Sequence, residues 1–382
     1  MQKGIIALIK SGLSGEKIPL PANFSIEGAY SILLRHQIVA LCYEGAAICG
    51  IPKNSPTMNK LFQYNYKNLI KSEGQDREIA NILSVFEENK IDYLPLKGCI
   101  LKDLYPRREL RQMGDADILV KEKQYKAIKP LVISRGFKEK IGSDHAYIWY
   151  KKELTLELHK RPAPADILEF YDYFGDGWSK ALHKSGCCYA LSPEDEYIYI
   201  FSHFAKHFYL GGIGYRQAID LWLFKKNYPQ LDWNYIEEEI KKLKLFEFYK
   251  NVVSTLQVWF EDAEANEITD LISDFIFNSG SWGNDENKAI SKTARHKDRN
   301  SSLAKAKFKR KIHLFFPTGT SLQGRYRILE KAPFLLPLIW VYRWADILKN
   351  RPKNISYRLK EANSVTEKNL TEYRENMHRL GL

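Results

Sequence analysis

The sequence predicts an α+β protein in which a small mixed β-sheet core is flanked by N-terminal and C-terminal helical regions. Three observations support this class. Apolar residues such as Ile79, Ile82 and Phe86 recur at helical spacing before residue 90. Short segments between residues 91 and 190 alternate polar and apolar side chains, as half-buried strands do. A helix start then follows at Ser192-Pro193-Glu194-Asp195, which combines a capping serine, a proline at the first helical position and acids in the first turn.

A chain of 382 residues is long for a single core, so several substructures are expected. The sequence divides into an N-terminal helical region (1–90), a strand-rich core (91–190), a second helical region (191–280) and a basic, mainly helical C-terminal region (281–382). Asn278 to Arg299 is polar and contains glycine, which makes it the best candidate linker.

The elements follow in order along the chain. Helical spacing covers Ser25 to Cys49 and Lys60 to Asn89, with Pro52 and Pro56 breaking the run between them. The first strand is Ile91 to Leu96, and Gly98 opens a helix whose N–H groups would favour a phosphate. The remaining core elements are a strand at Asp117 to Val120, a helix at Lys123 to Ser134 interrupted at Pro130, and strands at Phe137 to Ile141, Ala146 to Tyr150 and Leu154 to Leu158.

The helix after Ser192 carries His203 and His207 four residues apart on one face. Such a pair can ligate zinc, but the glutamate of the metalloprotease motif is absent, so a packed or hydrogen-bonded pair facing the core is favoured. Arg216 and Asp220 have the same spacing and are expected to pair along the next helix.

Asp115-Ala116-Asp117 stands at the mouth of the apolar strand Ile118-Leu119-Val120. Side chains at i and i+2 of a strand point to the same side, so the two carboxylates repel each other unless a cation lies between them. Carboxylate oxygens are hard ligands that suit Mg²⁺, which proteins commonly hold with one or two carboxylates plus substrate phosphates. The motif therefore predicts a metal–nucleotide site.

A third acid comes from Leu154-Thr155-Leu156-Glu157-Leu158-His159, where Thr155, Glu157 and His159 share one face. A strand beside the Asp-x-Asp strand would bring Glu157 to the same edge of the sheet. Three carboxylates on two strands can hold two divalent ions about 3.5–4 Å apart, as in-line phosphoryl displacement requires.

This order of elements resembles the nucleotidyltransferase fold of the DNA polymerase beta type. The closer likeness is to the large family of poorly characterised bacterial nucleotidyltransferases, which carry a Leu-Lys-Gly turn before the Asp-x-Asp strand. The residues concerned are Leu94-Pro95-Leu96-Lys97-Gly98, Tyr105-Pro106, Arg111 and Asp115-Ala116-Asp117. The flanks His36-Gln37-Ile38-Val39 and His203-Phe204-Ala205-Lys206-His207 also resemble that family.

The resemblance implies Mg²⁺-dependent transfer of a nucleoside monophosphate from an NTP, ATP among the candidates, to an acceptor hydroxyl with release of pyrophosphate. Asp115, Asp117 and Glu157 would be catalytic and would hold Mg²⁺, with Mn²⁺ as the alternative. Lys97 and Gly98 would bind the phosphates. Lys97 would replace the serine that typically follows the glycine in the wider superfamily, where this chain has Cys99. Arg111 would contact the leaving pyrophosphate or, equally, lie on the surface.

The positive charge is concentrated at the C-terminal end. Residues 1–284 carry 36 basic and 37 acidic side chains, whereas residues 285–382 carry 22 basic and nine acidic ones. The densest cluster is Lys305, Lys307, Lys309, Arg310 and Lys311. This region is either a solvated helix face or linker, or the site of an anionic partner.

Five cysteines without Cys-x-x-Cys spacing favour a reducing cytoplasm. No export signal is recognised, and no apolar run approaches the roughly 20 residues of a transmembrane segment. The longest such run, Ala332 to Tyr342, is expected to be a buried helix, with a membrane-surface patch as the alternative.

Two functions of different classes follow. The first is a nucleotidyltransferase whose acceptor is a small molecule, such as an aminoglycoside or sugar, or a protein. The alternative is a catalytically silent nucleotide- or nucleic-acid-binding scaffold protein that uses the basic C-terminal region.

Overall fold

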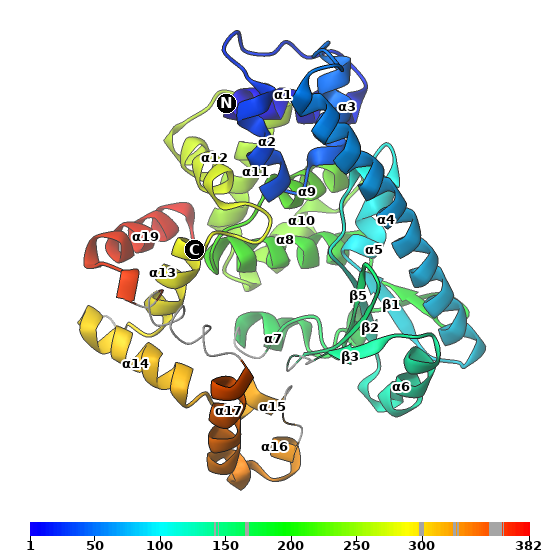
Figure 1. Ribbon diagram of the computed structural model, residues 1–382, viewed down its shortest axis with the longest axis vertical. Coiled ribbons are helices and arrows are strands. Elements are labelled where there is room, and N and C mark those ends of the chain that lie inside the picture. The colour runs from blue at the N-terminus through cyan, green and yellow to red at the C-terminus, as the bar shows by residue number, and fades with distance from the viewer. Residues whose placement is uncertain are drawn as a thin grey trace.

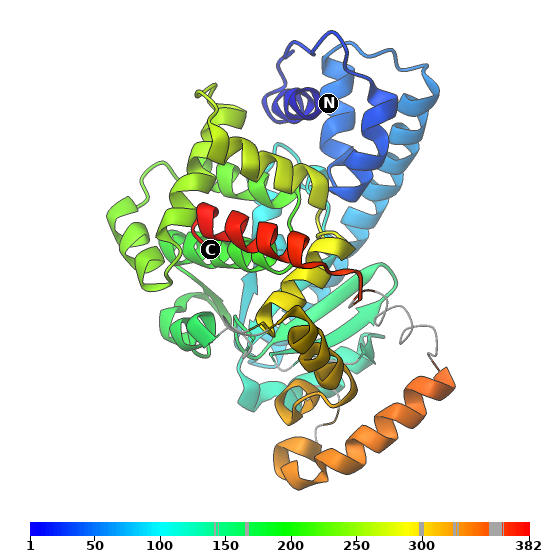
Figure 2. The same cartoon turned by 90° about the vertical axis from the view of Figure 1, so that its left-hand side faces the viewer.

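The computed structural model describes residues 1–140, 143, 145–164, 168–297, 302–323, 326, 328–350, 361 and 363–382. A seven-stranded mixed sheet lies between two helical regions, which confirms the predicted α+β class (Figure 1). The helices α1–α3 lie beside α8–α12 in two views, whereas α14–α17 lie at the opposite end of the molecule (Figures 1 and 2).

The N-terminal region consists of four helices: α1 (Gln2–Ser14), α2 (Ile26–Arg35), α3 (Val39–Ile48) and α4 (Pro56–Glu88). Ser55 caps α4 by accepting a hydrogen bond from the Met58 N–H, and Pro56 occupies its first turn, as a helix start prefers. The predicted helix over 25–49 is two helices, because Gln37 takes a left-handed conformation at φ 54° between them.

The sheet has the strand order β3-β4-β5-β2-β1-β7-β6. The strands are β1 (Tyr93–Leu96), β2 (Asp115–Val120), β3 (Lys138–Lys140), β4 (Ala146–Lys151), β5 (Leu154–His159), β6 (Leu182–Ser185) and β7 (Cys188–Ala190). β2 pairs antiparallel with β1 and parallel with β5. The β6–β7 hairpin was not predicted; β6 is exposed throughout, so its sequence lacks the burial alternation that marks a strand.

The two faces of the sheet belong to different hydrophobic cores. Ile118 and Val120 of β2 pack with residues of α4 and α6 (Tyr125–Ser134), while Leu119 packs with the helical regions on the other face. The helix α6 continues through Pro130, so the predicted interruption is wrong. Asp115 and Asp117 share the parity of Leu119 and therefore face the C-terminal helices.

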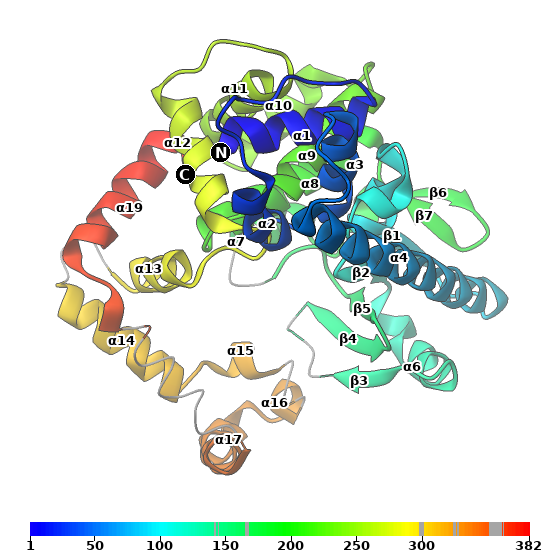
Figure 3. The same ribbon diagram turned by 45° about the horizontal axis from the view of Figure 1, so that its top comes forward.

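The C-terminal half is helical. Its helices are α8 (Pro193–Tyr209), α9 (Tyr215–Asn227), α10 (Trp233–Lys242), α11 (Phe246–Phe260), α12 (Glu267–Ser279), α13 (Asp285–Arg295), α14 (Leu303–Phe315), α15 (Gly319–Gln323), α16 (Ile328–Lys331), α17 (Leu336–Asn350) and α19 (Glu367–Leu380). Two short helices lie in the core, α5 (Gly98–Leu101) and α7 (Leu168–Phe174). Figure 3 shows α19 beside α12 and the α14–α17 segment as an arc below α13.

Two C-terminal predictions are wrong. The expected linker at 278–299 contains α13, an amphipathic helix that buries Ala289, Ile290 and Ala294. The apolar run at 332–342 is not a buried helix, because Phe334, Leu338, Val341 and Tyr342 are 63–80% exposed on and just before α17. Hydropathy identifies an apolar face but does not reveal whether another element covers it.

The predicted basic cluster on α14 contains one structural arginine. Arg310 is buried, donates to the Thr293 hydroxyl and pairs with Glu361 at 2.8 Å. Its guanidinium therefore contributes to packing between α13 and α14 rather than to an exposed basic face.

Candidate active site

Asp117 and Glu157 are register partners on the parallel strands β2 and β5. Each lies between apolar neighbours that point to the opposite core, Ala116 and Ile118 on β2 and Leu156 and Leu158 on β5. Parallel pairing in register places the two side chains on the same face. The predicted convergence of these acids is therefore present in the structure.

A cavity of about 300 Å³ opens on this face. It is lined by every residue that the sequence analysis selected for the site: Lys97, Gly98, Arg111, Asp115, Asp117 and Glu157. The opposite wall comes from α8, α9 and the loop after α12, which contribute His203, Lys206, His207, Arg216, Gln217, Ser281 and Trp282. The cavity thus lies between the sheet and the C-terminal helices.

Asp117 is the most strongly paired acid of the cavity. Its Oδ1 accepts hydrogen bonds from the Lys97 ammonium and from His159 Nε2, each at 2.7 Å. Burial alone would raise the pKa of Asp117, but Lys97 and the hydrogen bond from His159 outweigh it and hold this pKa below its usual range. Asp117 is therefore ionised at neutral pH.

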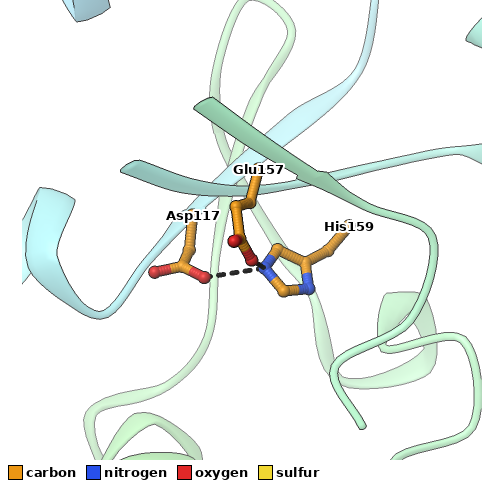
Figure 4. A group of neighbouring side chains, drawn as sticks. All are labelled: Asp117, Glu157 and His159. Carbon is orange, nitrogen blue, oxygen red and sulfur yellow. Dashed lines mark hydrogen bonds and ion pairs between the residues drawn. The ribbon is translucent and has the colours of Figure 1, made fainter. Parts of the chain in front are cut away.

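His159 was not predicted as a site residue. Burial lowers its pKa to about 4 despite the neighbouring Asp117, so the ring is neutral and donates through Nε2. Figure 4 shows this nitrogen between the carboxylates of Asp117 and Glu157, and its distance to Glu157 Oε2 is 3.6 Å. The sequence did contain a signal for this role, because His159 alternates with apolar residues on β5 and so shares one face with Thr155 and Glu157.

Lys97 owes its position to an unusual backbone conformation. Its φ of 45° and ψ of −113° lie in a region that L-residues avoid, and such conformations concentrate at functional sites. Gly98 follows it in a tight space, because a Cβ there would lie 2.9 Å from Met113 Sδ and 3.1 Å from Arg111 Nη1. The predicted helix after Gly98 is only the four-residue α5, so a large helix dipole is absent from this turn.

Asp115 and Glu157, unlike Asp117, have no hydrogen-bonded cation among the described residues that outweighs the effect of burial on their pKa. Burial and the neighbouring Asp117 raise the pKa of Asp115. Burial, Asp117 and Asp115 raise the pKa of Glu157 to about 7. Carboxylates whose pKa rises in this way gain from a cation.

The donor set fits a divalent cation. Ligand atoms of Asp117, Glu157 and His159 all lie within 4.8 Å of one another, and Asp115 lines the same cavity outside this close group. Oxygen donors of this kind suit Mg²⁺ or Mn²⁺, whereas His159 Nε2 carries the proton donated to Asp117 and is not a ligand in this arrangement.

Arg111 is not a surface residue. Its Nε and Nη2 donate to the two carboxylate oxygens of Asp220, each at 2.8 Å, and the Tyr105 hydroxyl donates to the same carboxylate. The predicted partner of Asp220 was Arg216, but Arg111 takes this place. The remaining amino group, Nη1, lies beside Gly98 at the cavity wall.

Arg216 is a second arginine of the cavity that the sequence analysis did not select. It is buried, and Nη1 donates to the Gln112 carbonyl, while Nε has no hydrogen-bond partner among the described residues. A buried guanidinium in the cavity wall adds positive charge on the side opposite the acids. Its helical spacing from Asp220 had been interpreted as an internal ion pair, which concealed this role.

His203 and His207 face the acids across the cavity, with ring centroids 4.4 Å apart. Burial lowers the pKa of both, that of His207 to about 3, so both rings are neutral. The packed pair that the sequence predicted is thus present, at the cavity wall.

A mixed sheet that presents two aspartates and a glutamate beside a Lys-Gly turn defines the class of a nucleotidyltransferase. The family described as an uncharacterised nucleotidyltransferase matches residues 23–261, and the chain belongs to this family. Membership supports nucleotidyl transfer as the general activity. No curated protein and no solved structure matches the chain. In the part of the chain that the structure describes, every helix is too short or too polar to cross a membrane.

Proposed function

We propose that the protein is a Mg²⁺-dependent nucleotidyltransferase that moves a nucleoside monophosphate from an NTP to an acceptor hydroxyl and releases pyrophosphate. The observation that carries this proposal is the convergence of Asp115, Asp117 and Glu157 in one cavity with Lys97 and Arg216. Acids for a cation and basic groups for a triphosphate are the two requirements of this chemistry.

Asp115, Asp117 and Glu157 are the proposed metal ligands, with Mn²⁺ as an alternative to Mg²⁺. A bound divalent cation would neutralise phosphate oxygens and polarise the phosphorus that is attacked. His159 would orient Asp117 through the hydrogen bond from Nε2, as partners of metal-binding carboxylates generally do.

Three basic groups would position the triphosphate. The Lys97 ammonium lies 2.7 Å from Asp117, so it can neutralise a phosphate bound beside that acid. Arg216 lines the same cavity and would add a second positive charge near the phosphates. Arg111 offers only Nη1, because Asp220 occupies its other donors. Arg111 would contact the leaving pyrophosphate through this single group, close to Gly98.

Glu157 would accept the proton of the acceptor hydroxyl. Its pKa of about 7 belongs to the metal-free site. A bound cation would lower this pKa, so Glu157 would take the proton as an ionised carboxylate. The acceptor oxygen then attacks the α-phosphorus, the bond to the bridging oxygen breaks, and pyrophosphate leaves with its electron pair. The acceptor remains either a small hydroxyl compound or a protein hydroxyl.

A triphosphate panel tests this proposal. The full chain with Mg²⁺ and each of the four NTPs is assayed for pyrophosphate release, with cell extract as the source of acceptors. The Asp117→Asn variant should lose this release, whereas Asp262→Asn, an exposed partner of Lys10 remote from the cavity, should keep it. Release that persists in Asp117→Asn would overturn the proposal. Tight, salt-dependent nucleic-acid binding without nucleotide affinity would favour the scaffold function instead.

A further inference from the structure

Trp282 stands at the mouth of the cavity with 53% of its surface exposed. It belongs to the loop between α12 and α13, beyond residue 261, where the family match ends. Its ring packs over Gly114, since a Cβ on Gly114 would lie 3.2 Å from Trp282 Cζ2. Gly114 immediately precedes Asp115, so the ring lies beside the backbone that carries this proposed metal ligand.

The loop that carries Trp282 is firmly built. The Ser281 N–H donates to the Arg35 carbonyl at 3.0 Å, and its hydroxyl donates to the His36 carbonyl at 2.7 Å. The Gln217 side-chain amide donates to the Ser281 carbonyl at 3.1 Å. These bonds anchor the backbone directly before Trp282.

Two glycines allow the close approach of this loop. Gly280 has a φ of +101°, and a Cβ there would lie 2.4 Å from Arg35 Cγ. Gly283 has a φ of +68°, and a Cβ there would lie 2.4 Å from the Gly211 carbonyl oxygen. Both positions favour glycine for conformational and steric reasons. The glycines at 280 and 283 thus allow the backbone on either side of Trp282 to pack closely against Arg35 and Gly211.

Apart from its packing over Gly114, the ring of Trp282 has no aromatic, cation or hydrogen-bond partner among the described residues. The chain has eight tryptophans. The other seven each make a ring, cation or hydrogen-bond contact, namely Trp149, Trp178, Trp222, Trp233, Trp259, Trp340 and Trp344. Trp282 makes none of these contacts with another described side chain. A large aromatic side chain that lines a cavity, is half exposed and lacks such a partner has ring surface available to a ligand.

Among the described apolar side chains that line the cavity, Trp282 is the one exposed to solvent. The other apolar lining residues, Leu101, Met113, Ile200 and Phe204, are buried. The interior is dominated by charged and polar groups that suit phosphates and a cation. A ligand with a charged end and a flat, weakly polar end would therefore place its flat end at Trp282.

We propose that Trp282 is the stacking platform for the nucleobase of the bound triphosphate. This inference rests on the proposed function, because it assigns the base of the same nucleotide whose phosphates lie near Lys97 and Arg216. Every base has a π-face, so stacking tolerates different bases. The platform contributes affinity for all four nucleotides, and more for the larger purines than for the pyrimidines.

Calorimetry with two probes tests this site. The non-hydrolysable α,β-methylene-ATP carries a base, whereas inorganic tripolyphosphate does not, and both are titrated with Mg²⁺ into the full chain. Trp282→Ala should weaken binding of the nucleotide analogue by between about fivefold and a hundredfold and leave tripolyphosphate binding unchanged. Trp282→Phe should stay within about threefold of wild type, because an aromatic face remains. Trp340→Ala, on the remote α17, is the matched control.

Each outcome decides the question. Loss of nucleotide affinity alone supports the platform. Unchanged nucleotide affinity in Trp282→Ala overturns it and leaves the proposed function standing. Equal loss of both probes shows that the loop supports the phosphate site, which also overturns the platform. Failure of the wild-type chain to bind either probe overturns both this inference and the proposed function.

Discussion

Arg111 and Asp220 form a buried, bidentate ion pair that joins the segment before β2 to α9. Both side chains are almost fully removed from solvent. The same carboxylate accepts a hydrogen bond from Tyr105, so the pair is part of a small network. Because α9 also carries Arg216, this network fixes one wall of the cavity relative to the acids on β2.

Loss of this ion pair should destabilise the fold. Asp220→Asn would leave the Arg111 guanidinium buried without its counter-ion, which typically costs about 3–5 kcal/mol. Urea unfolding of the variant and the wild type measures this difference. Asp262→Asn, which breaks the exposed pair with Lys10, should cost less than about 1 kcal/mol. A similarly small effect for Asp220→Asn would contradict the structural role of the pair.

The Asp115→Asn and Asp117→Asn variants should differ in stability, and both should lose turnover. Either Asn variant should reduce pyrophosphate release by at least about a hundredfold, because charge that organises the transition state is lost. Asp117→Asn should also destabilise the protein, since Lys97 loses its ionised partner. Asp115→Asn should be neutral or stabilising, because burial and repulsion from Asp117 already disfavour its charge. Melting temperatures alongside activity measure both effects, and equal shifts in the two variants would argue against this assignment.

The face of the sheet on which the three acids lie could be predicted, because the alternation of side chains along a strand depends only on neighbouring residues. The polar parity of Asp115, Asp117 and Glu157 against apolar neighbours fixes which face each side chain takes. The structure adds the parallel pairing of β2 with β5, which strand alternation alone does not specify. The α+β class was predictable for the same reason, since helical and strand periods differ along the chain.

The opposite wall of the cavity could not be predicted in this way. The Arg111–Asp220 pair joins residues 109 apart, and helical spacing favoured the wrong partner, Arg216. Trp282 lies in a segment whose polar, glycine-containing composition indicated a linker. Its glycines serve close packing against Arg35 and Gly211, which only the tertiary structure reveals.

The Gly98 turn should not tolerate a methyl group. In Gly98→Ala the Cβ would lie within 3.1 Å of both Met113 Sδ and Arg111 Nη1, so one of them must move. Overpacking of this kind costs about 1–3 kcal/mol, and displacement of Arg111 should weaken tripolyphosphate binding as well. Urea unfolding and calorimetry measure the two effects. Gly74→Ala is the control, since a Cβ on Gly74 would meet no atom within 4 Å. Wild-type stability and affinity in Gly98→Ala would show that the turn is less tightly packed.

Glu157 should make the metal-free protein less stable as the pH rises. Its pKa is raised from 4.5 to about 7, so the folded state binds a proton more tightly than the unfolded state. The resulting stability is fully present below pH about 4.5 and is lost as the pH rises through about 7, by up to about 3 kcal/mol. The side chain in the Glu157→Gln variant stays neutral across this pH range, so its stability should not fall in this way. The variant should therefore match wild type near pH 4.5, exceed its stability at pH 8, and have lost activity.

Urea unfolding at pH 5 and pH 8, without divalent cations and then with Mg²⁺, measures this effect. In wild type at pH 8, added Mg²⁺ should restore stability, because a cation among the acids compensates the Glu157 charge. In Glu157→Gln the gain from Mg²⁺ should be smaller, since one ligand charge is missing. Thr155→Ala, on the same face of β5, controls for a general change in the strand. Parallel stability curves for wild type and Glu157→Gln across this pH range would show that Glu157 is ionised without cost, which would contradict its raised pKa in the metal-free site.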